Sequence, residues 1–302
     1  MVAISVITPS YNRADFIRTA LNSVSNQNYL DVEHIIVDGN STDSTLSILK
    51  EYQNLKVIRE PDRGVYDALN KGIKLAQGEI IAQLNTDDYF EPDIFTMIAE
   101  IFNENSDIDA ISAGARVFEL TPSGEKTFAT YGGIKKEDLL FRITLGTPTF
   151  NAWFFRKDVF RKIGDYSLDY SLAADRDLLL RFHIAGLKHF SMEKVVYHYC
   201  QHPLSLTMNN LHDRQDRVYR EMIELAEKYL AIQNDPSLKK SCLRWRDRAY
   251  IELFASDVLR RNIGGMVQVT SSATKKNPMW PLKLLAASPL GIIKLVEKRY
   301  AR

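Results

Sequence analysis

The first hundred residues alternate between short apolar runs and longer segments in which apolar residues recur every three or four positions. The runs are rich in β-branched residues and end in turn formers, as "VAISVITPS" ends at Pro9 and Ser10, so they predict buried strands. The periodic segments predict amphipathic helices, with Asp43 as the N-cap of the second and Gly78 at C′ of the third. The expected strands cover residues 2–10, 33–37, 55–60 and 79–85, and the expected helices cover 14–26, 44–52 and 64–78.

This alternation predicts right-handed βαβ units, and therefore an α/β fold with a mostly parallel sheet and helices on both faces. In such sheets ligands bind beyond the carboxyl ends of the strands. Acidic or aromatic residues follow the end of each predicted strand: Tyr11, Asp38, Glu60 with Asp62, and Asp87 with Asp88. The sequence therefore predicts a polar site at one edge of the sheet.

The pattern changes after about residue 105. Expected there are a strand over 109–118, a hairpin over 121–133, a strand running into a helix over 149–164, a helix over 171–186 that Gly186 ends, and a strand over 194–202. Residues 213–259 are highly charged and have a helical pattern. We therefore expect an α/β domain over residues 1–205, with halves at 1–105 and 106–205, and a helical extension over 206–302.

Composition and charge are those of an ordinary globular protein. The 302 residues are 45% hydrophobic and 25% charged. The formal net charge is only +1, so the overall electrostatic potential does not favour a nucleic-acid partner. Cys200 and Cys242 lie far apart and lack metal-ligand spacing, which argues against a disulfide framework. The chain begins without a signal-like segment, and no run reaches the length of a spanning helix. A cytoplasmic protein is expected, with peripheral contact at the inner face of the membrane left open.

The adjacent carboxylates Asp87 and Asp88 repel each other at a strand end unless a cation or hydrogen-bond donors offset their charge. A hard ion such as Mg²⁺ or Mn²⁺ prefers oxygen ligands and often joins one or two carboxylates to substrate phosphates. The alternative is that they are turn residues, or an N-cap for a helix starting near Pro92. Further aspartates after neighbouring strands favour the metal interpretation.

Four segments in order and at matching spacing carry a family resemblance: "VITPSYNRADFIRTALNSVSNQNY", "IIVDGNSTDST", "DRGVYDALNKG" and "GEIIAQLNTDDYFEPD". Together they resemble the family 2 glycosyltransferases, which use nucleotide-diphospho-sugars and have the GT-A fold. Further along, "SLAADRDLLLRFHIAG" resembles the acidic acceptor-side motif of that family. The resemblance extends to about residue 205, and it implies a nucleotide-sugar-binding half over 1–105 and an acceptor half over 106–205.

The resemblance also implies roles for single residues. The residues it assigns to nucleotide-sugar binding are Pro9, Tyr11, Asp38, Asp62, Arg63, Asn85 and Asp87, and those it assigns to the metal, Mg²⁺ or Mn²⁺, are Asp87 and Asp88. Pro9 and Tyr11 would flank the base, and Asp38 would hydrogen-bond it. The chain departs from the family toward less acidity at Gly39, at Asn85 in the DXD-type motif, and at Ala174.

The chemistry of sugar transfer explains these residue types. A divalent metal neutralises the charge that develops on the leaving diphosphate, and a carboxylate takes the proton of the attacking acceptor hydroxyl. Asp175 matches the acidic position of the acceptor-side motif and is the expected base. Asp177 is the weaker alternative because it cannot share the helical face of Asp175. The other interpretation of Asp175 is a first-turn carboxylate that favours the helix dipole.

Histidines are dense between residues 183 and 212, but their spacings match no zinc motif. Surface or core positions are expected for most of them, and contact of His198 or His202 with the diphosphate is the alternative.

The C-terminal segment mixes basic and apolar residues. The basic ones are Lys275, Lys276, Lys283, Lys294, Lys298 and Arg299. This mixture is typical of interfacial helices on anionic lipid, where a polyprenyl-linked acceptor would be found. Packing on the domain or in a homodimer interface explains the pattern equally well.

Together with the residues at the strand ends, the family resemblance implies an inverting, metal-dependent glycosyltransferase. It implies transfer of a sugar from a UDP-, GDP- or dTDP-sugar to a saccharide or polyprenyl-linked acceptor, and the resemblance alone implies a setting in surface polysaccharide or glycan biosynthesis. One rival is a sugar nucleotidyltransferase, which would normally have a Gly-rich basic loop where this chain has "TPSYNRAD". The other is a non-catalytic binding module of the same fold, which the departures toward less acidity leave open.

Overall fold

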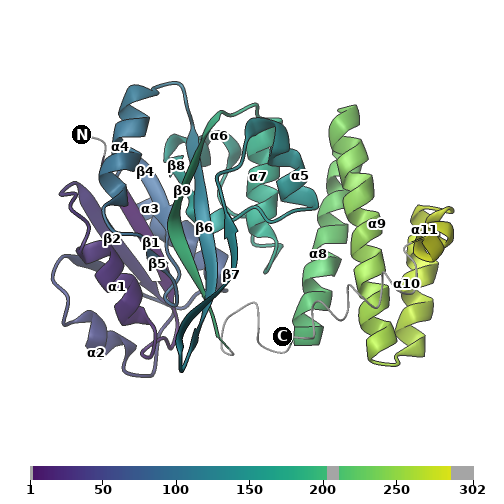
Figure 1. Cartoon of the computed structure of the whole chain (residues 1–302), viewed down its shortest axis with the longest axis horizontal. Helices are drawn as coiled ribbons and strands as arrows, with labels where there is room; N and C mark the ends of the chain where they lie inside the picture. The colour runs from purple at the N-terminus through teal and green to yellow at the C-terminus, as the bar shows by residue number, and fades with distance from the viewer. Residues whose placement is uncertain (1–2, 203–210, 287–302) are drawn as a thin grey trace. The chain divides into compact units, whose positions relative to one another are not determined.

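The computed structural model describes residues 3–202 and 211–286. The chain forms two compact units, Met1–Met208 and Asn209–Arg302. The first contains the sheet and the second is helical (Figure 1). The domain boundary expected between residues 205 and 206 lies outside the described residues.

The expected alternation of strands and helices is confirmed at the start of the chain. The strands are β1 (Ile4–Ser10), β2 (Val32–Asp38), β3 (Leu55–Arg59) and β4 (Ile80–Gln83), and the helices between them are α1 (Ile17–Ser25), α2 (Thr45–Leu49) and α3 (Val65–Leu75). The strands pair in parallel in the order β3-β2-β1-β4. Because Ser10 pairs with Asp38 and Asp38 with Arg59, the loops that follow β1, β2 and β3 begin side by side.

The later strands extend this parallel sheet into a mixed one. The further elements are β5 (Tyr89–Phe90), α4 (Ile94–Glu104), β6 (Ala110–Thr121), β7 (Gly124–Tyr131), a 3₁₀ turn (Lys136–Asp138), α5 (Leu139–Thr144), a second 3₁₀ turn (Phe150–Ala152), β8 (Trp153–Arg156), α6 (Asp158–Ile163), α7 (Ala174–Ile184) and β9 (His189–Gln201). Strand β8 is antiparallel to β4 and β6, whereas β9 is parallel to β6 and antiparallel to β5. The expected hairpin is confirmed as β6 and β7. The sequence did not predict the two-residue strand β5.

Both faces of the sheet are covered, and β8 shows how one strand serves both. Phe154 packs in the core cluster that includes residues of α1 and α4. Its neighbours Trp153 and Phe155 point to the opposite face, where each packs against Phe182 of α7. A strand that is buried on both faces has apolar residues at consecutive positions, which is why apolar and polar residues do not alternate in "WFF".

Two helix ends differ from the sequence-based expectation. The N-cap of α2 is Ser44 rather than Asp43, whose carboxylate instead accepts hydrogen bonds from the backbone N–H groups of Thr45 and Ala14. Helix α3 ends at Leu75 with Ala76 as its C-cap, so Gly78 is not at C′. Gly78 is needed because β1 passes close by: a Cβ there would lie 2.7 Å from the backbone nitrogen of Ser5.

The C-terminal unit contains α8 (Leu211–Ile232), α9 (Pro236–Leu259), α10 (Ile263–Lys276) and α11 (Trp280–Ala286). Asp235 caps α9 by accepting a hydrogen bond from the backbone N–H of Leu238, and Pro236 occupies the first turn. Trp280 is buried in a core cluster with Tyr250 and Leu253 of α9. This packing makes the helices one unit.

Two of the basic residues of the C-terminal segment form ion pairs within the C-terminal unit. Lys276 pairs with Glu227 at 2.8 Å, and Lys283 pairs with Asp247 at 2.6 Å. The remainder of the expected interfacial segment, with Lys294, Lys298 and Arg299, lies outside the described residues. Within residues 3–202 and 211–286, no helix has the length and apolar character needed to cross a membrane.

The close approach at Gly78 makes Gly78→Ala a test of the packing between β1 and the segment after α3. The added methyl group meets backbone atoms that cannot rotate away, so we expect the free energy of unfolding to fall by about 1–3 kcal/mol. Gln77→Ala, at the exposed neighbouring position, should change it by less than about 0.5 kcal/mol. Urea unfolding of both variants measures this difference, and equal stabilities would contradict the packing argument.

The buried histidine His34 predicts a pH dependence of stability. Its Nε2 lies 2.9 Å from the Thr8 hydroxyl, and burial lowers its pKa to about 3. The unfolded chain takes up a proton near pH 6.5 that the folded chain excludes, so stability present above pH 6.5 is lost as the pH falls. We expect this loss to reach about 1.4 kcal/mol per pH unit between pH 6 and 5. His34→Gln should have a shallower slope in urea titrations over that range; an unchanged slope would show that His34 is not the group responsible.

Candidate active site

Asp38, at the end of β2, is fully buried and closes the loop that follows it. Its Oδ1 accepts a hydrogen bond from the backbone N–H of Ser41 at 2.8 Å, and its Oδ2 accepts one from the Ser41 hydroxyl at 2.5 Å. Aspartate commonly stabilises a turn in this way. Both oxygens are thus engaged inside the protein, and the base contact expected of Asp38 stays a prediction.

Asp62, Gly39 and Tyr11 come together from the loops after three neighbouring strands. A Cβ at Gly39 would lie 2.4 Å from Asp62 Oδ2 and 3.5 Å from Tyr11 Cδ2, so the missing side chain at Gly39 provides the space for Asp62. Asp62 Oδ1 accepts a hydrogen bond from the backbone N–H of Gly64 at 2.9 Å. The Tyr11 side chain is 57% exposed. The three residues therefore form an open corner with an aromatic ring and a carboxylate.

Pro9 and Arg63 are also expected to bind the nucleotide, and each is close in sequence to a residue of this corner. Pro9 is half-buried within β1 and pairs with Val37 of β2. The Arg63 guanidinium is mostly exposed and approaches the Asp67 carboxylate at 3.7 Å. The nucleotide-binding roles expected of Pro9 and Arg63 stay predictions.

The carboxylate of Asp88 is buried and accepts three hydrogen bonds. Oδ2 accepts from the Tyr197 hydroxyl at 2.7 Å and from the Asn85 side-chain amide at 3.0 Å. Oδ1 accepts from the backbone N–H of Cys200 at 2.9 Å. Since Tyr197 and Cys200 belong to β9, Asp88 fastens the turn after β4 to that strand. The interpretation of this pair as a helix N-cap is wrong, because α4 begins at Ile94 with Asp93 as its N-cap.

The environment of Asp88 changes the acidity of the groups around it. Burial, and to a smaller extent the charge of Asp87, raise the pKa of Asp88 above its usual value, while the three hydrogen bonds act in the opposite direction by stabilising the carboxylate. Burial and the charge of Asp88 raise the pKa of Tyr197 well above its usual value, so its hydroxyl keeps the proton that it donates. Burial likewise raises the pKa of the Cys200 thiol to about 11.

Asp87 has a different partner from Asp88. Its Oδ2 lies 3.0 Å from Nε2 of His202, and both side chains are partly accessible at 15% and 13% exposure. The His202 ring stacks on Phe16 with a centroid distance of 4.2 Å. The ends of β4 and β9 and the start of α1 therefore meet at this pair.

A carboxylate next to an imidazole provides two metal ligands of the kinds that proteins use. Among the described residues, no group of three or more His, Cys, Asp or Glu side chains is arranged to hold a metal ion. A cation bound at Asp87 and His202 would take its other ligands from substrate phosphates and water, as Mg²⁺ commonly does. His198, the other histidine considered for such a contact, instead pairs with Glu91 at 2.6 Å.

Asp175 and Asp177 lie in the first turn of α7 in different surroundings. Asp177 is buried and pairs with Arg181 Nε at 2.8 Å. Asp175 is half-buried, and its Oδ1 accepts a hydrogen bond from the backbone N–H of Arg176 at 2.7 Å. Asp177 is therefore committed to an ion pair, and Asp175 is the more accessible of the two carboxylates.

The pKa of the buried Tyr199 is raised by its surroundings. Burial raises the pKa of Tyr199 well above its usual value, and the charges of Asp88 and Asp175 both raise it further. The Tyr199 hydroxyl accepts a hydrogen bond from the backbone N–H of Asn151 at 2.9 Å.

Sequence reasoning gave little weight to His202 and did not single out Tyr197. Strand β9 carries tyrosines at alternate positions, Tyr197 and Tyr199, which predicts that both hydroxyls point to one face. Which residues that face meets depends on the pairing of β9 with β5 and β6, and this pairing joins strands about 80 to 110 residues apart.

Comparison with known protein families identifies a match over more than half of the chain. Residues 5–164 match the model of "Glycosyl transferase family 2". A PGL/p-HBAD biosynthesis glycosyltransferase of Mycobacterium tuberculosis is 33% identical over 183 residues, which cover 59% of this chain and 68% of that protein. An uncharacterized glycosyltransferase of Nostoc sp. is 31% identical over 173 residues, covering 53% of this chain and 52% of its own length.

Solved structures resemble this fold over nearly the whole chain. The crystal structure of S. aureus TarS residues 1–349 in complex with UDP-GlcNAc has a TM-score of 0.67 and 19% identity, covering 96% of this chain and 88% of its own. The mannosyltransferase PcManGT from Pyrobaculum calidifontis, in complex with GDP-Man and Mn²⁺, has a TM-score of 0.57 and 16% identity, covering 100% and 88%. At these identities the likeness concerns the fold.

The contrast between Asp88 and Asp87 predicts different effects on stability. In Asp88→Asn, either orientation of the new amide places an N–H group against a donor, so we expect the free energy of unfolding to fall by about 1–3 kcal/mol. Asp87→Asn keeps an acceptor for His202 at a partly accessible position and should cost less than about 1 kcal/mol. Urea unfolding of the metal-free proteins gives both values. An Asp88→Asn protein as stable as wild type would contradict the assignment of three donors to that carboxylate.

Proposed function

Because this chain belongs to the glycosyl transferase family 2 and has the GT-A fold, we propose that it transfers a sugar from a nucleotide-diphospho-sugar to a saccharide or polyprenyl-linked acceptor, with inversion at the anomeric carbon. The observation that carries this proposal is the meeting of Asp87 with His202 at the end of β4. A diphosphate bound at this pair would lie beyond the carboxyl end of β4, where sheets of this kind bind their ligands.

The base of the donor is proposed to bind in the corner formed by Tyr11, Gly39 and Asp62. Asp62 Oδ2 faces Gly39 and has no hydrogen-bond partner among the described residues, whereas both oxygens of Asp38 are engaged by Ser41. A carboxylate oxygen can accept a ring N–H, and the exposed Tyr11 ring offers a face for stacking. Uracil, thymine and guanine all carry such an N–H, and the structural neighbours were crystallised with UDP-GlcNAc and GDP-Man.

Mg²⁺ or Mn²⁺ is the proposed cofactor, held by Asp87 with His202 beside it. The partial exposure of both side chains fits a cation that shares its coordination with a diphosphate. Such a cation neutralises the charge of the departing nucleotide diphosphate. The hydrogen bonds of Asp88 support Asp87 by fixing the turn on which both lie. Direct ligation by Asp88, expected from the sequence, stays a prediction.

Asp175 is proposed to accept the proton of the acceptor hydroxyl. It is the half-buried carboxylate of the first turn of α7, and Asp177 is unavailable because it pairs with Arg181. The Arg176 side chain donates to the backbone oxygens of Ile143 and Gly146, which fastens this turn to the last turn of α5 and the residues that follow it. A base held in this way keeps its orientation while the acceptor approaches.

The acceptor is proposed to belong to surface polysaccharide or glycan biosynthesis. The name of the mycobacterial relative assigns that protein to PGL/p-HBAD biosynthesis. Peripheral contact with a membrane through the C-terminal unit would bring the enzyme to a polyprenyl-linked acceptor. The exposure of Ile263 and Val267, one turn apart on α10 at 72% and 64%, supports such a contact.

Release of nucleotide diphosphate from a panel of UDP-, GDP- and dTDP-sugars with Mn²⁺ or Mg²⁺ tests the proposal. We expect slow, metal-dependent release from one donor, abolished by a chelator and restored by Mn²⁺. Asp87→Asn and Asp175→Asn should each lower turnover by about 100-fold or more. Asp107→Asn, which removes an exposed carboxylate paired with Lys188, is the matched control and should retain full activity.

Undiminished release in Asp87→Asn and Asp175→Asn would overturn the assignment of both residues. If wild type binds a nucleotide diphosphate but turns over no donor in the presence of candidate saccharide and polyprenyl-linked acceptors, the chain is a non-catalytic binding module. Isothermal titration with UDP, GDP and dTDP in the presence of Mn²⁺ provides the binding measurement.

A further inference from the structure

A chain of buried and partly buried side-chain hydrogen bonds connects the turn after β4 with the segment that leads into α7. Its members come from five parts of the N-terminal unit: Tyr166 before α7, Gln83 at the end of β4, Asn151 before β8, Tyr197 on β9 and Asp88 in the turn after β4. The chain runs between the two parts of the site that the proposed function assigns to donor and acceptor.

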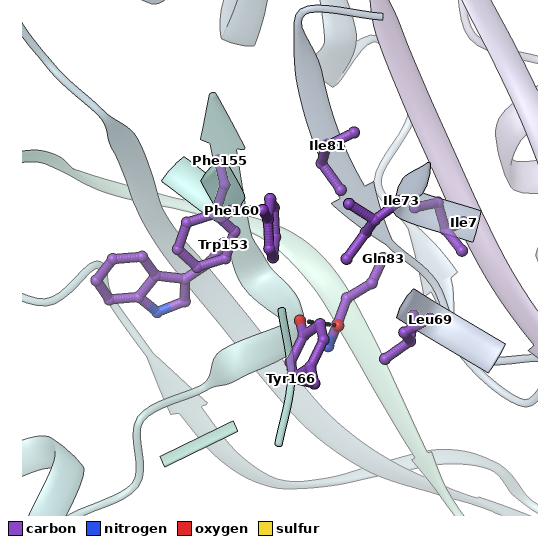
Figure 2. A pocket seen from close by; sticks show the side chains of 9 residues that line it. All are labelled: Ile7, Leu69, Ile73, Ile81, Gln83, Trp153, Phe155, Phe160 and Tyr166. Carbon is purple, nitrogen blue, oxygen red and sulfur yellow. Dashed lines mark hydrogen bonds between the residues drawn. The ribbon is translucent and has the colours of Figure 1, made fainter. Parts of the chain in front are cut away.

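Every donor in this chain points toward Asp88. The Tyr166 hydroxyl donates to Gln83 Oε1 at 2.8 Å, as Figure 2 shows, and the Gln83 amide donates to Asn151 Oδ1. The Asn151 amide donates to the Tyr197 oxygen at 3.2 Å. The Tyr197 hydroxyl then donates to Asp88 Oδ2 at 2.7 Å. Hydrogen bonds aligned in this way polarise one another, so that each bond strengthens the next.

The end of the chain at Asp88 fixes this direction. The Tyr197 oxygen accepts hydrogen bonds from the backbone N–H of Asn85 at 3.1 Å and from the Asn151 amide, which leaves its own proton for Asp88. Since the Asn151 nitrogen faces Tyr197, its oxygen faces Gln83. Reversing any single amide would therefore place two donors or two acceptors against each other.

The other end of the chain is held equally firmly. The backbone N–H of Tyr166 donates to Asn70 Oδ1, and the Asn70 amide donates to the backbone oxygen of Tyr166, both at 2.9 Å. The Tyr166 ring stacks on Tyr66 at a centroid distance of 5.3 Å. Asn70 and Tyr66 belong to α3, so the segment before α7 is tied to that helix as well as to Gln83.

The surroundings of the Gln83–Tyr166 contact are apolar. Figure 2 shows these two side chains at a small cavity whose other lining residues are Ile7, Leu69, Ile73, Ile81, Trp153, Phe155 and Phe160. A polar group that loses its partner among these apolar side chains is left partly desolvated, so the loss of this contact destabilises the structure around it.

We propose that Gln83, Asn151 and Tyr166 are positioning residues that keep the donor-side turn (residues 85–88) and the acceptor-side segment (residues 166–175) at a fixed spacing. This inference rests on the proposed function, because transfer requires the acceptor oxygen and the anomeric carbon within about 3–3.5 Å of each other. A purely structural role would stabilise the fold as a whole. A positioning role couples these two segments to each other.

Amide hydrogen exchange measured by mass spectrometry without ligand tests the coupling directly. Tyr166→Phe removes the first donor of the chain, and Gln83→Leu removes its middle, while both leave the three donors to Asp88 in place. We expect peptides covering residues 85–90 to exchange about fivefold to tenfold faster in both variants. Peptides from β2 and from the C-terminal unit should be unchanged. Tyr52→Phe, which removes an exposed hydroxyl that donates to Asn22, is the matched control and should match wild type.

Kinetics with the donor found in the panel separate positioning from binding. Tyr166→Phe should lower kcat by about fivefold to tenfold and leave the donor KM within about twofold, because Asp88 keeps all its partners. Tyr197→Phe removes a donor from Asp88 itself and should weaken nucleotide binding in the presence of Mn²⁺.

The inference is overturned if the turn at residues 85–90 exchanges as in wild type in both chain variants, or if exchange rises uniformly across the N-terminal unit. It is also overturned if KM rather than kcat changes in Tyr166→Phe. Failure of the proposed function would be recognised separately, since wild type would then neither bind a nucleotide diphosphate nor turn over a donor, whereas the exchange experiment needs no ligand.

Discussion

The hydrogen bonds that converge on the Asp88 carboxylate are the interaction on which the rest of the site depends. They fasten the turn after β4 to β9, and β9 in turn brings His202 to Asp87. Two adjacent carboxylates at the end of a strand would repel each other if both were exposed to the same surroundings. The protein resolves this by burying one among donors and leaving the other at an accessible position next to an imidazole.

The same division occurs at the other acidic positions of the site. Asp38 closes its own loop through Ser41, while Asp62 presents an oxygen to the open corner beside Tyr11. In α7, Asp177 is buried in an ion pair with Arg181, while Asp175 remains half-buried. In each case one acid is buried and holds the local backbone or an ion pair, and the second acid is more accessible.

Sequence pattern predicted the first half of the fold well because each βαβ unit is a local structure with its own periodicity. The strands β1 to β4 and the helices between them follow from apolar runs and amphipathic segments of ordinary length. The two-residue strand β5 is too short to have a period, and it forms because Tyr89 and Phe90 pair with His198 and Tyr197. Gly78 was assigned to a helix end, but its role comes from the passage of β1, which no local pattern reveals.

The sequence by itself determined the family, the parallel half of the sheet and the set of acidic residues at its edge, because these depend on motifs and periodicities that lie within short stretches of chain. Only the tertiary structure decided which of those acids are available. Asp38 and Asp88 have the same chemistry as Asp62 and Asp87, and what separates them is burial and the donors around them. The donors to Asp88 include Tyr197, more than a hundred residues away along the chain, so the distinction between Asp88 and Asp87 arises only when β9 joins the sheet.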